Sequence, residues 1–218
     1  MIHFACVNVG TAYSPEYTSR LYRGIKRHFK GEWDFTVVVD HYNKAINPYA
    51  NVGFFMVWDK VLDIPPPEKI KNFYWWAKLN IFRDDIWPKG ETVVYIDLDS
   101  IVVNNLKPLT EIQGFGMIDW GAFKHPVGSG VMVFKAGMHT HLYRDFDIRQ
   151  RHKWPRGDQK YIGGKIKKIT SIGPTLVASY KRHQRQDEHG DEAIVAFHGR
   201  PRPHELARES WAYKEWVK

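Results

Sequence analysis

The chain has 218 residues, of which 43% are hydrophobic and 26% are charged, and this composition is typical of one globular domain with a full core. No apolar run approaches the roughly 18 residues of a membrane-spanning helix, and a single cysteine, Cys6, excludes an internal disulfide. The formal net charge of +8 favours anionic partners. We therefore expect a single domain, residues 1–218, in the cytoplasm.

The first 40 residues predict a strand, a helix and a second strand. "FACVNVG" (4–10) and "FTVVVD" (35–40) are short β-branched segments, and residues 14–30 between them have apolar side chains at helical spacing after Ser14-Pro15. No basic stretch or cleavage site precedes the first segment, so we expect a strand there and not a signal peptide. Two strands joined by a helix run parallel.

The following segments continue the pattern of an α/β protein. After the break "IPPPEK" (64–69), residues 72–86 predict one helix, and "ETVVYID" (91–97) predicts a buried central strand. Residues 128–137 and 192–199 predict later strands. We expect an open, mostly parallel sheet flanked by helices, with a small C-terminal part and ligands at the carboxyl ends of the strands.

Two carboxylates interrupt the apolar segment "VVYIDLDSIVV" (93–103). Burying an unpaired carboxylate is costly, so Asp97 and Asp99 need compensation. Residues two apart in an extended chain face the same way, and carboxylate oxygens suit Mg²⁺ or Mn²⁺. A divalent cation would compensate both charges. Alternatively, Asp97 ends the strand and Asp99 or Ser100 caps a turn.

Residues 149–168 carry most of the net charge, and Trp154 and Tyr161 lie among the cations. The basic residues are Arg149, Arg151, Lys153, Arg156, Lys160, Lys165, Lys167 and Lys168, and the one acidic residue is Asp158. Such a segment attracts phosphates or other polyanions, with a solvated surface loop as the alternative.

Six stretches in order resemble the nucleotide-sugar-dependent glycosyltransferases of the GT-A fold, especially family 8 and its bacterial and phage relatives. The D-x-D sequence is followed by N-x-L-x-P-L. The other five stretches are residues 6–29, "FYWWAKLNIF" (73–82), "GSGVMVF" (128–134), "GDQKYI" (157–162) and "FHGRPRPHEL" (197–206). The resemblance implies a nucleotide-binding half, 1–105, and a donor-sugar and acceptor half, 106–218.

The resemblance implies that Asp97 and Asp99 bind Mn²⁺ or Mg²⁺ at the diphosphate of a donor, most commonly a UDP-sugar. The family's third ligand, a histidine, corresponds to Ala196 here. We hypothesise that His198, on the same side of the predicted strand, replaces it. In the alternative, the two carboxylates and phosphates hold the metal and His198 is structural.

The resemblance also implies a set of donor-binding residues. Tyr13, or less favourably Tyr17, would stack on the nucleobase, and Lys78 would contact the phosphates unless its stem packs on neighbouring aromatic rings and its head is solvated. The full set is Val7, Asn8, Gly10, Tyr13, Asp40, Lys78, Asp97, Ser129, Gly130, Gly199 and Arg202.

For the reaction, the resemblance implies Asp158 and Gln159 near the anomeric carbon. It favours retention of configuration, and if the enzyme inverts, Asp158 is the candidate base. Because both residues lie in the basic segment, we expect an anionic acceptor, such as DNA with a hydroxylated base or an acidic glycan or lipid head group.

Two other functions fit parts of the sequence. A haloacid-dehalogenase-like phosphatase would use Asp97 as nucleophile, although Ser100 and Ile101 replace its usual glycine and threonine. A catalytically inactive nucleic-acid-binding module would use the basic segment alone.

Overall fold

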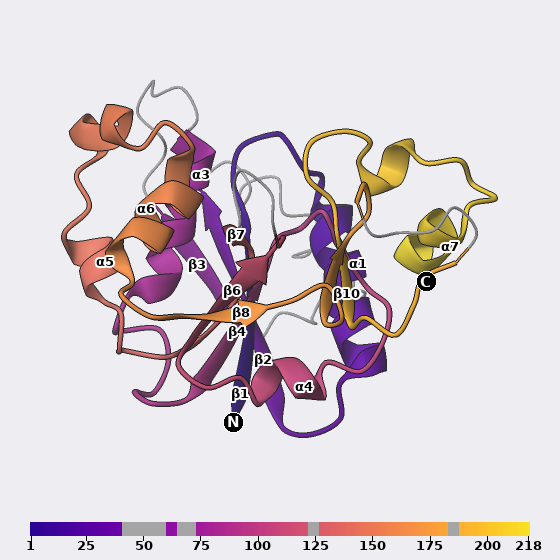
Figure 1. The fold of residues 1–218 in the computed structure, drawn as a ribbon, viewed down its shortest axis with the longest axis horizontal. Helices are drawn as coiled ribbons and strands as arrows, with labels where there is room; N and C mark the ends of the chain where they lie inside the picture. The colour runs from indigo at the N-terminus through magenta and orange to yellow at the C-terminus, as the bar shows by residue number, and fades with distance from the viewer. Residues whose placement is uncertain (41–59, 65–72, 122–126, 183–187) are drawn as a thin grey trace.

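The computed structural model describes residues 1–40, 60–64, 73–121, 127–182 and 188–218, which form a central sheet with helices on both faces (Figure 1). The strands of this seven-stranded sheet, in spatial order, are β3 (Lys60–Ile64), β2 (Trp33–Asp40), β1 (Ile2–Asn8), β4 (Thr92–Ile96), β7 (Val127–Lys135), β6 (Phe115–Asp119) and β8 (Ile169–Ile172). A three-stranded sheet contains β5 (Ser100–Val102), β10 (Ile194–Ala196) and β9 (Val177–Ser179).

The large sheet is mostly parallel, as predicted. Within it only β7 runs antiparallel to its two described neighbours, β4 and β6. The first strand, α1 (Pro15–His28) and β2 form the predicted parallel unit with a helical crossover. Strands from residues 1–105 and 106–218 share this sheet, because β4 pairs with β7. The division into two functional halves stays a prediction.

The remaining helical segments are short. The α-helices are α3 (Phe73–Ala77), α4 (Lys107–Thr110), α5 (His141–Arg144), α6 (Gly157–Lys165) and α7 (Trp211–Val217). The 3₁₀ helices are η2 (Lys78–Phe82), η3 (Ile148–Lys153) and η4 (Pro203–Glu205). In Figure 1, α1 and α7 lie on one side of the large sheet, and α3, α5 and α6 lie on the other. No helix in the described segments is both long and apolar enough to cross a bilayer.

Both faces of the large sheet are buried. Along β4, Val94 and Ile96 belong to the core on the α1 side, whereas Val93 and Tyr95 belong to the core on the α6 side. Burial of alternate residues on opposite faces explains why the segment reads as an uninterrupted apolar run. On β1 the thiol of Cys6 is fully buried, and burial raises its pKa well above the ordinary value.

The structure differs from the prediction of one helix over residues 72–86. The α-helix ends at Ala77, η2 continues to Phe82, and Arg83 is extended. The side chain of Asn80 donates a hydrogen bond to the Ala77 carbonyl at 2.9 Å, which competes with the continuing helical pattern. The prediction of a single helix was therefore wrong at its C-terminal end. The predicted break at 64–69 lies, beyond Ile64, outside the described residues.

Candidate active site at the carboxyl end of β4

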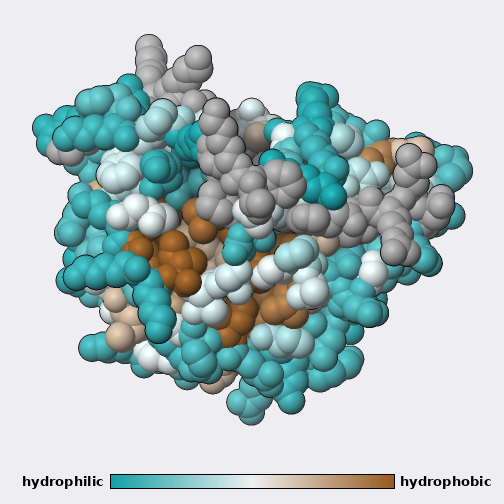
Figure 2. Space-filling model, in the orientation of Figure 1, coloured by the Kyte–Doolittle hydropathy of each residue, from teal (hydrophilic) through white to brown (hydrophobic). Residues whose placement is uncertain are grey.

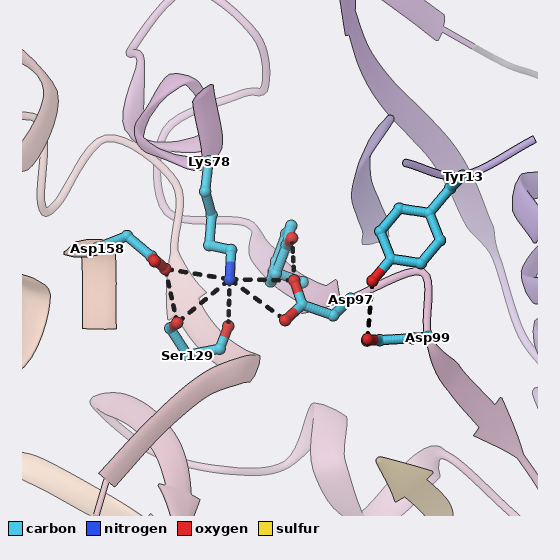
Figure 3. A network of polar contacts seen from close by, with 7 residues as sticks. Tyr13, Lys78, Asp97, Asp99, Ser129 and Asp158 are labelled. Atoms are coloured by element: carbon cyan, nitrogen blue, oxygen red, sulfur yellow. Dashed lines mark hydrogen bonds and ion pairs between the residues drawn. The ribbon is translucent and has the colours of Figure 1, made fainter. Parts of the chain in front are cut away.

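The two predicted carboxylates lie in a turn between β4 and β5. The amide of Ser100 donates to the Asp97 carbonyl at 3.1 Å, and Leu98 between the carboxylates is buried in the core. The extended Asp97–Asp99 segment that we predicted is thus replaced by a turn. Figure 3 shows that the Asp97 carboxylate points towards Lys78 and that of Asp99 towards Tyr13.

Lys78 joins two carboxylates from distant parts of the chain. Its ammonium lies 3.0 Å from Asp97 Oδ1 and 3.1 Å from Asp158 Oδ2, and it donates to Ser129 Oγ and to the Ser129 carbonyl, both at 3.2 Å (Figure 3). Burial lowers the pKa of Lys78, but the charges of Asp158 and Asp97 outweigh burial and raise it above its ordinary value. The ammonium is therefore charged and buried, which rules out the predicted alternative of a solvated head.

Asp97 is held on one side and open on another. The Tyr95 hydroxyl donates to Asp97 Oδ1 at 2.5 Å, while 33% of the Asp97 side-chain surface stays exposed. Burial raises the pKa of Asp97, which Lys78 and Tyr95 counteract only in part. A Cβ at Gly130 would lie 3.3 Å from Asp97 Oδ2, so the absence of a side chain there keeps space beside this oxygen.

Asp99 is more deeply buried than Asp97. It accepts a hydrogen bond from the Tyr13 hydroxyl at 2.8 Å, and its backbone carbonyl accepts from the Phe197 amide at 3.0 Å. The pKa of Asp99 is raised to about 7, mainly by burial and secondly by the negative charge of Asp97. Without a cation, Asp99 is thus partly protonated at neutral pH.

These residues fit a hard divalent cation. Two adjacent carboxylates with raised pKa values are destabilised by burial and mutual repulsion, and a cation relieves both. Mg²⁺ and Mn²⁺ commonly take few protein oxygens and complete their coordination with water and phosphate oxygens. Within the described part of the chain, no group of three His, Cys, Asp or Glu side chains is placed to hold a metal.

In the described part of the chain, His198 and the two carboxylates do not form a group of three that could hold a metal ion. The Nε2 of His198 lies 2.7 Å from Ser179 Oγ, and its ring lies 5.6 Å from that of Trp120. The position agrees with the predicted alternative, a hydrogen-bonded histidine beside the site. Gly199 follows with a φ of 75°, a conformation that glycine adopts readily.

The loop after β1 meets the segment after β10. Gly10 turns the chain with a φ of 69°, and the Arg202 guanidinium lies 4.6 Å from the centre of the Tyr13 ring. Arg202 Nη1 also donates to the Ala12 carbonyl at 2.6 Å. One face of Tyr13, the residue predicted to stack on a nucleobase, is therefore covered by Arg202.

The other residues predicted to contact the nucleotide differ in how far their side chains are buried. Tyr17 is buried against Tyr13 and Trp216, so its ring is not open to a base. Asn8 is buried at the end of β1 and donates to Thr18 Oγ1 at 2.9 Å, while its Oδ1 has no partner among the described residues. Val7 is half-buried beside it, and Asp40 ends β2 with a side chain that lies outside the described residues.

Asp158 lies in the first turn of α6, where Gly157 sets the direction of the chain. Gly157 has a φ of 65°, and a Cβ there would come 2.5 Å from the Trp75 ring. The Ser129 hydroxyl donates to Asp158 Oδ2 at 2.6 Å. The structure thus brings Asp158 together with Lys78 and Asp97, and places the half-buried Gln159 next to it.

No protein-family model matches the chain, and no curated protein matches it in sequence. Solved structures do match. A structure of an active-site mutant of LgtC has a TM-score of 0.69, and a structure of the galactosyltransferase LgtC in complex with donor and acceptor sugar analogues has a TM-score of 0.67. Both are 14% identical over 99% of this chain and 94% of LgtC. The glycosyltransferase GlyE of Streptococcus pneumoniae TIGR4 has 0.65 at 15% identity, over 100% of this chain and 60% of GlyE. Mouse xyloside xylosyltransferase 1 has 0.55 at 14% identity, over 91% and 97% of the two chains.

The chain has the GT-A fold. Its D-x-D turn, Lys78 and Asp158 meet at the carboxyl end of a central strand, where ligands of open α/β sheets bind.

One residue of the candidate active site was missed in the sequence. Tyr95 lies two positions before Asp97, and its hydroxyl reaches that carboxylate. Because residues two apart on a strand face the same side, this spacing could have predicted the contact. The long-range partner Lys78 was singled out, but its pairing with Asp158 has no signal in the local sequence.

The basic residues of segment 149–168 are distributed along α6 and the segments on both sides of it. Arg149, Arg151, Lys153 and Arg156 precede α6, next to Asp158, whereas Lys165, Lys167 and Lys168 lie at the other end of that helix. At 1.5 Å per residue, α6 separates the two groups by about 12 Å. Only the first group adjoins the candidate active site.

Proposed function

We propose that this protein is a metal-dependent glycosyltransferase that transfers a sugar from a nucleotide diphosphate sugar, a UDP-sugar first, to an acceptor hydroxyl. The observation that carries the proposal is the D-x-D turn after β4, with Asp97 joined through Lys78 to Asp158. The fold adds support, because the solved structures that share it are glycosyltransferases.

Asp97 and Asp99 would hold Mn²⁺ or Mg²⁺ together with the donor diphosphate. When bound, the cation supplies Lewis-acid neutralisation of the charge on the departing diphosphate. Lys78 provides a permanent positive charge beside Asp97, and Gly130 leaves space there. Arg202 stands over Tyr13 and would contact phosphate after moving from the Ala12 carbonyl.

Asp158 and Gln159 would face the reacting carbon, and we propose retention of configuration. An inverting enzyme needs a base that accepts the acceptor proton. Asp158 Oδ2 already accepts from Ser129 and pairs with Lys78, so this oxygen is occupied. Determination of the product anomer by NMR tests the proposal, and an inverted product would contradict it.

The acceptor would approach beside Arg149, Arg151, Lys153 and Arg156, and we propose an anionic acceptor such as DNA with a hydroxylated base or an acidic glycan. Phosphate contacts weaken steeply with ionic strength. Transfer should therefore fall between 50 and 200 mM salt while donor hydrolysis stays constant. Transfer that is insensitive to salt would contradict an anionic acceptor.

A nucleotide-release assay tests the central proposal without an acceptor. The protein is incubated with UDP-, GDP- and ADP-sugars, with Mn²⁺, with Mg²⁺ and with EDTA. We expect metal-dependent release that Asp97→Asn and Asp99→Asn abolish. Asp191→Asn, which removes an exposed carboxylate elsewhere, serves as the matched control and should keep the wild-type rate.

The same preparation separates the alternatives. Hydrolysis of 4-nitrophenyl phosphate that depends on Asp97, without release from any nucleotide sugar, would indicate the phosphatase. A gel shift with DNA, without either activity, would indicate an inactive binding module. Manganese titration of His198→Ala with donor bound decides whether His198 ligates, since unchanged affinity would exclude ligation. The cytoplasmic location stays a prediction.

A further inference from the structure

A groove with a basic rim lies at the end of the large sheet opposite the D-x-D turn. This groove, of about 910 Å³, is bounded by the starts of β6 and β8, the end of β7 and the end of α6. Ser129 of the candidate active site and Lys135 of the groove both belong to β7, six residues apart. At roughly 3.3 Å per residue, about 20 Å separates the two sites along this strand.

The floor of the groove is apolar and aromatic. Phe115 and Ile166 are among its lining residues, and the His139 ring packs edge-on against Phe115 with 4.8 Å between the ring centres. Met138 stands at the rim with 59% of its surface exposed. In the view of Figure 1, β8 faces the reader, and Figure 2 shows hydrophobic surface around it that is bordered by hydrophilic side chains.

The rim carries an excess of positive charge. Its four lysines are Lys135, Lys165, Lys167 and Lys168, and its single acidic residue is Asp145. Lys135 donates to Thr92 Oγ1 at 2.7 Å, but Lys167 and Lys168 are exposed and form no ion pair among the described residues. Two adjacent cations without a described ion-pair partner therefore stand beside an apolar floor, on a rim whose one carboxylate is Asp145.

We infer that this groove binds a small organic phosphate, whose aromatic or aliphatic body lies on the floor and whose phosphate meets Lys167 and Lys168. The volume lies within the range of small-molecule sites, roughly 300–1,000 Å³. A nucleic-acid strand would instead need several phosphate contacts along a continuous basic track. The lysines that line the groove number four and share its rim with Asp145, so they suit one compact anion better than an extended strand.

The test uses the ¹⁵N-labelled full chain and 1-naphthyl phosphate as the probe, with inorganic phosphate, 1-naphthol and an eight-nucleotide oligothymidylate as comparisons. We expect 1-naphthyl phosphate to bind at least tenfold more tightly than inorganic phosphate or 1-naphthol. Its NMR shift changes should fall on residues 166–170 and not on residues 97–100.

The double variant Lys167→Gln/Lys168→Gln should weaken this binding at least tenfold. Lys26→Gln/Lys30→Gln removes the same charge from exposed positions at and just beyond the end of α1 and should leave it unchanged. Equal weakening by both double variants, equal affinity for inorganic phosphate, or binding of the oligonucleotide alone would each overturn the inference. None of these outcomes depends on nucleotide release, so the proposed activity is tested separately.

Discussion

At the scale of single residues, the candidate site depends on one buried ammonium group, that of Lys78, which pairs with two carboxylates. Lys78 forms ion pairs with Asp97 and Asp158. The Ser129 hydroxyl accepts a hydrogen bond from Lys78 and donates one to Asp158. A buried charge that loses its partner is expensive, so each member of this set restricts substitution at the others. The structural role of Lys78 can be separated from its proposed role in phosphate binding only by varying two residues together.

Lys78→Met should lower the free energy of unfolding by about 3 kcal/mol, because Asp158 then keeps a buried charge without its cation. Asp158→Asn in the same chain should restore part of the loss. Urea unfolding of the two single variants and the double variant measures the coupling. If the two losses simply add within about 0.5 kcal/mol, the pair is not coupled as described.

The pH dependence of metal binding should follow Asp99. Its folded pKa of about 7 lies above the ordinary aspartate value, so between these values the folded protein binds more protons than the unfolded chain. The stabilisation from this neutral carboxyl is present at low pH and is lost as the pH rises through 7. Metal-free protein should thus lose stability between about pH 4 and 7 and change little above that range.

In the proposed site Mn²⁺ would bind the ionised carboxylate, so its affinity should rise by up to about tenfold per pH unit below 7 and level off above it. Calorimetric titration at several pH values measures this profile. Asp99→Asn should weaken binding and flatten the rise, while Asp191→Asn should reproduce the wild-type profile. An affinity that is independent of pH from 5 to 8 would contradict the raised pKa.

At the scale of elements, the start of α6 positions Asp158. Gly157 has a positive φ and lies against the Trp75 ring, so this glycine is needed both for backbone conformation and for space. The local sequence "GDQKYI" marks the element, but the tight approach to Trp75 depends on two segments about 80 residues apart. Such contacts have no periodic signal in the sequence.

Gly157→Ala should lower the free energy of unfolding by roughly 2 kcal/mol, from the strained φ and the overlap with Trp75. Nucleotide release should fall as well, because the first turn of α6 carries Asp158. Thermal unfolding and the release assay measure the two effects. Gly173→Ala is the matched control, because a Cβ at Gly173 meets nothing within 4 Å, and it should change neither property.

At the scale of the whole molecule, the large sheet joins the two predicted halves. Pairing of β4 with β7 buries Val93 and Tyr95 beside residues that come later in the chain. Residues 1–105 alone should therefore fail to fold cooperatively and should expose the edge of β4. A dispersed ¹H–¹⁵N spectrum with a sharp unfolding transition for this fragment would show that the halves fold independently.

Periodic and local features predicted much of this fold. The β1–α1–β2 unit and the buried strand β4 follow from apolar spacing, β-branched composition and a proline in the first turn. The antiparallel course of β7, the early end of the helix near Lys78 and the position of His198 depend on long-range packing. The D-x-D pair was correctly placed at a strand end, but its turn geometry and its link to Asp158 required the structure.

The buried thiol of Cys6 makes site-specific labelling simple. Thiol reagents react with an accessible thiolate. Burial of Cys6 within β1 keeps reagents away from the sulfur and, by raising its pKa, keeps the thiol protonated. Since the chain has no other cysteine, a maleimide spin label or fluorophore added to a variant with one surface cysteine should attach only there. Distances between chosen surface positions can then be followed by spectroscopy without first replacing the native residue.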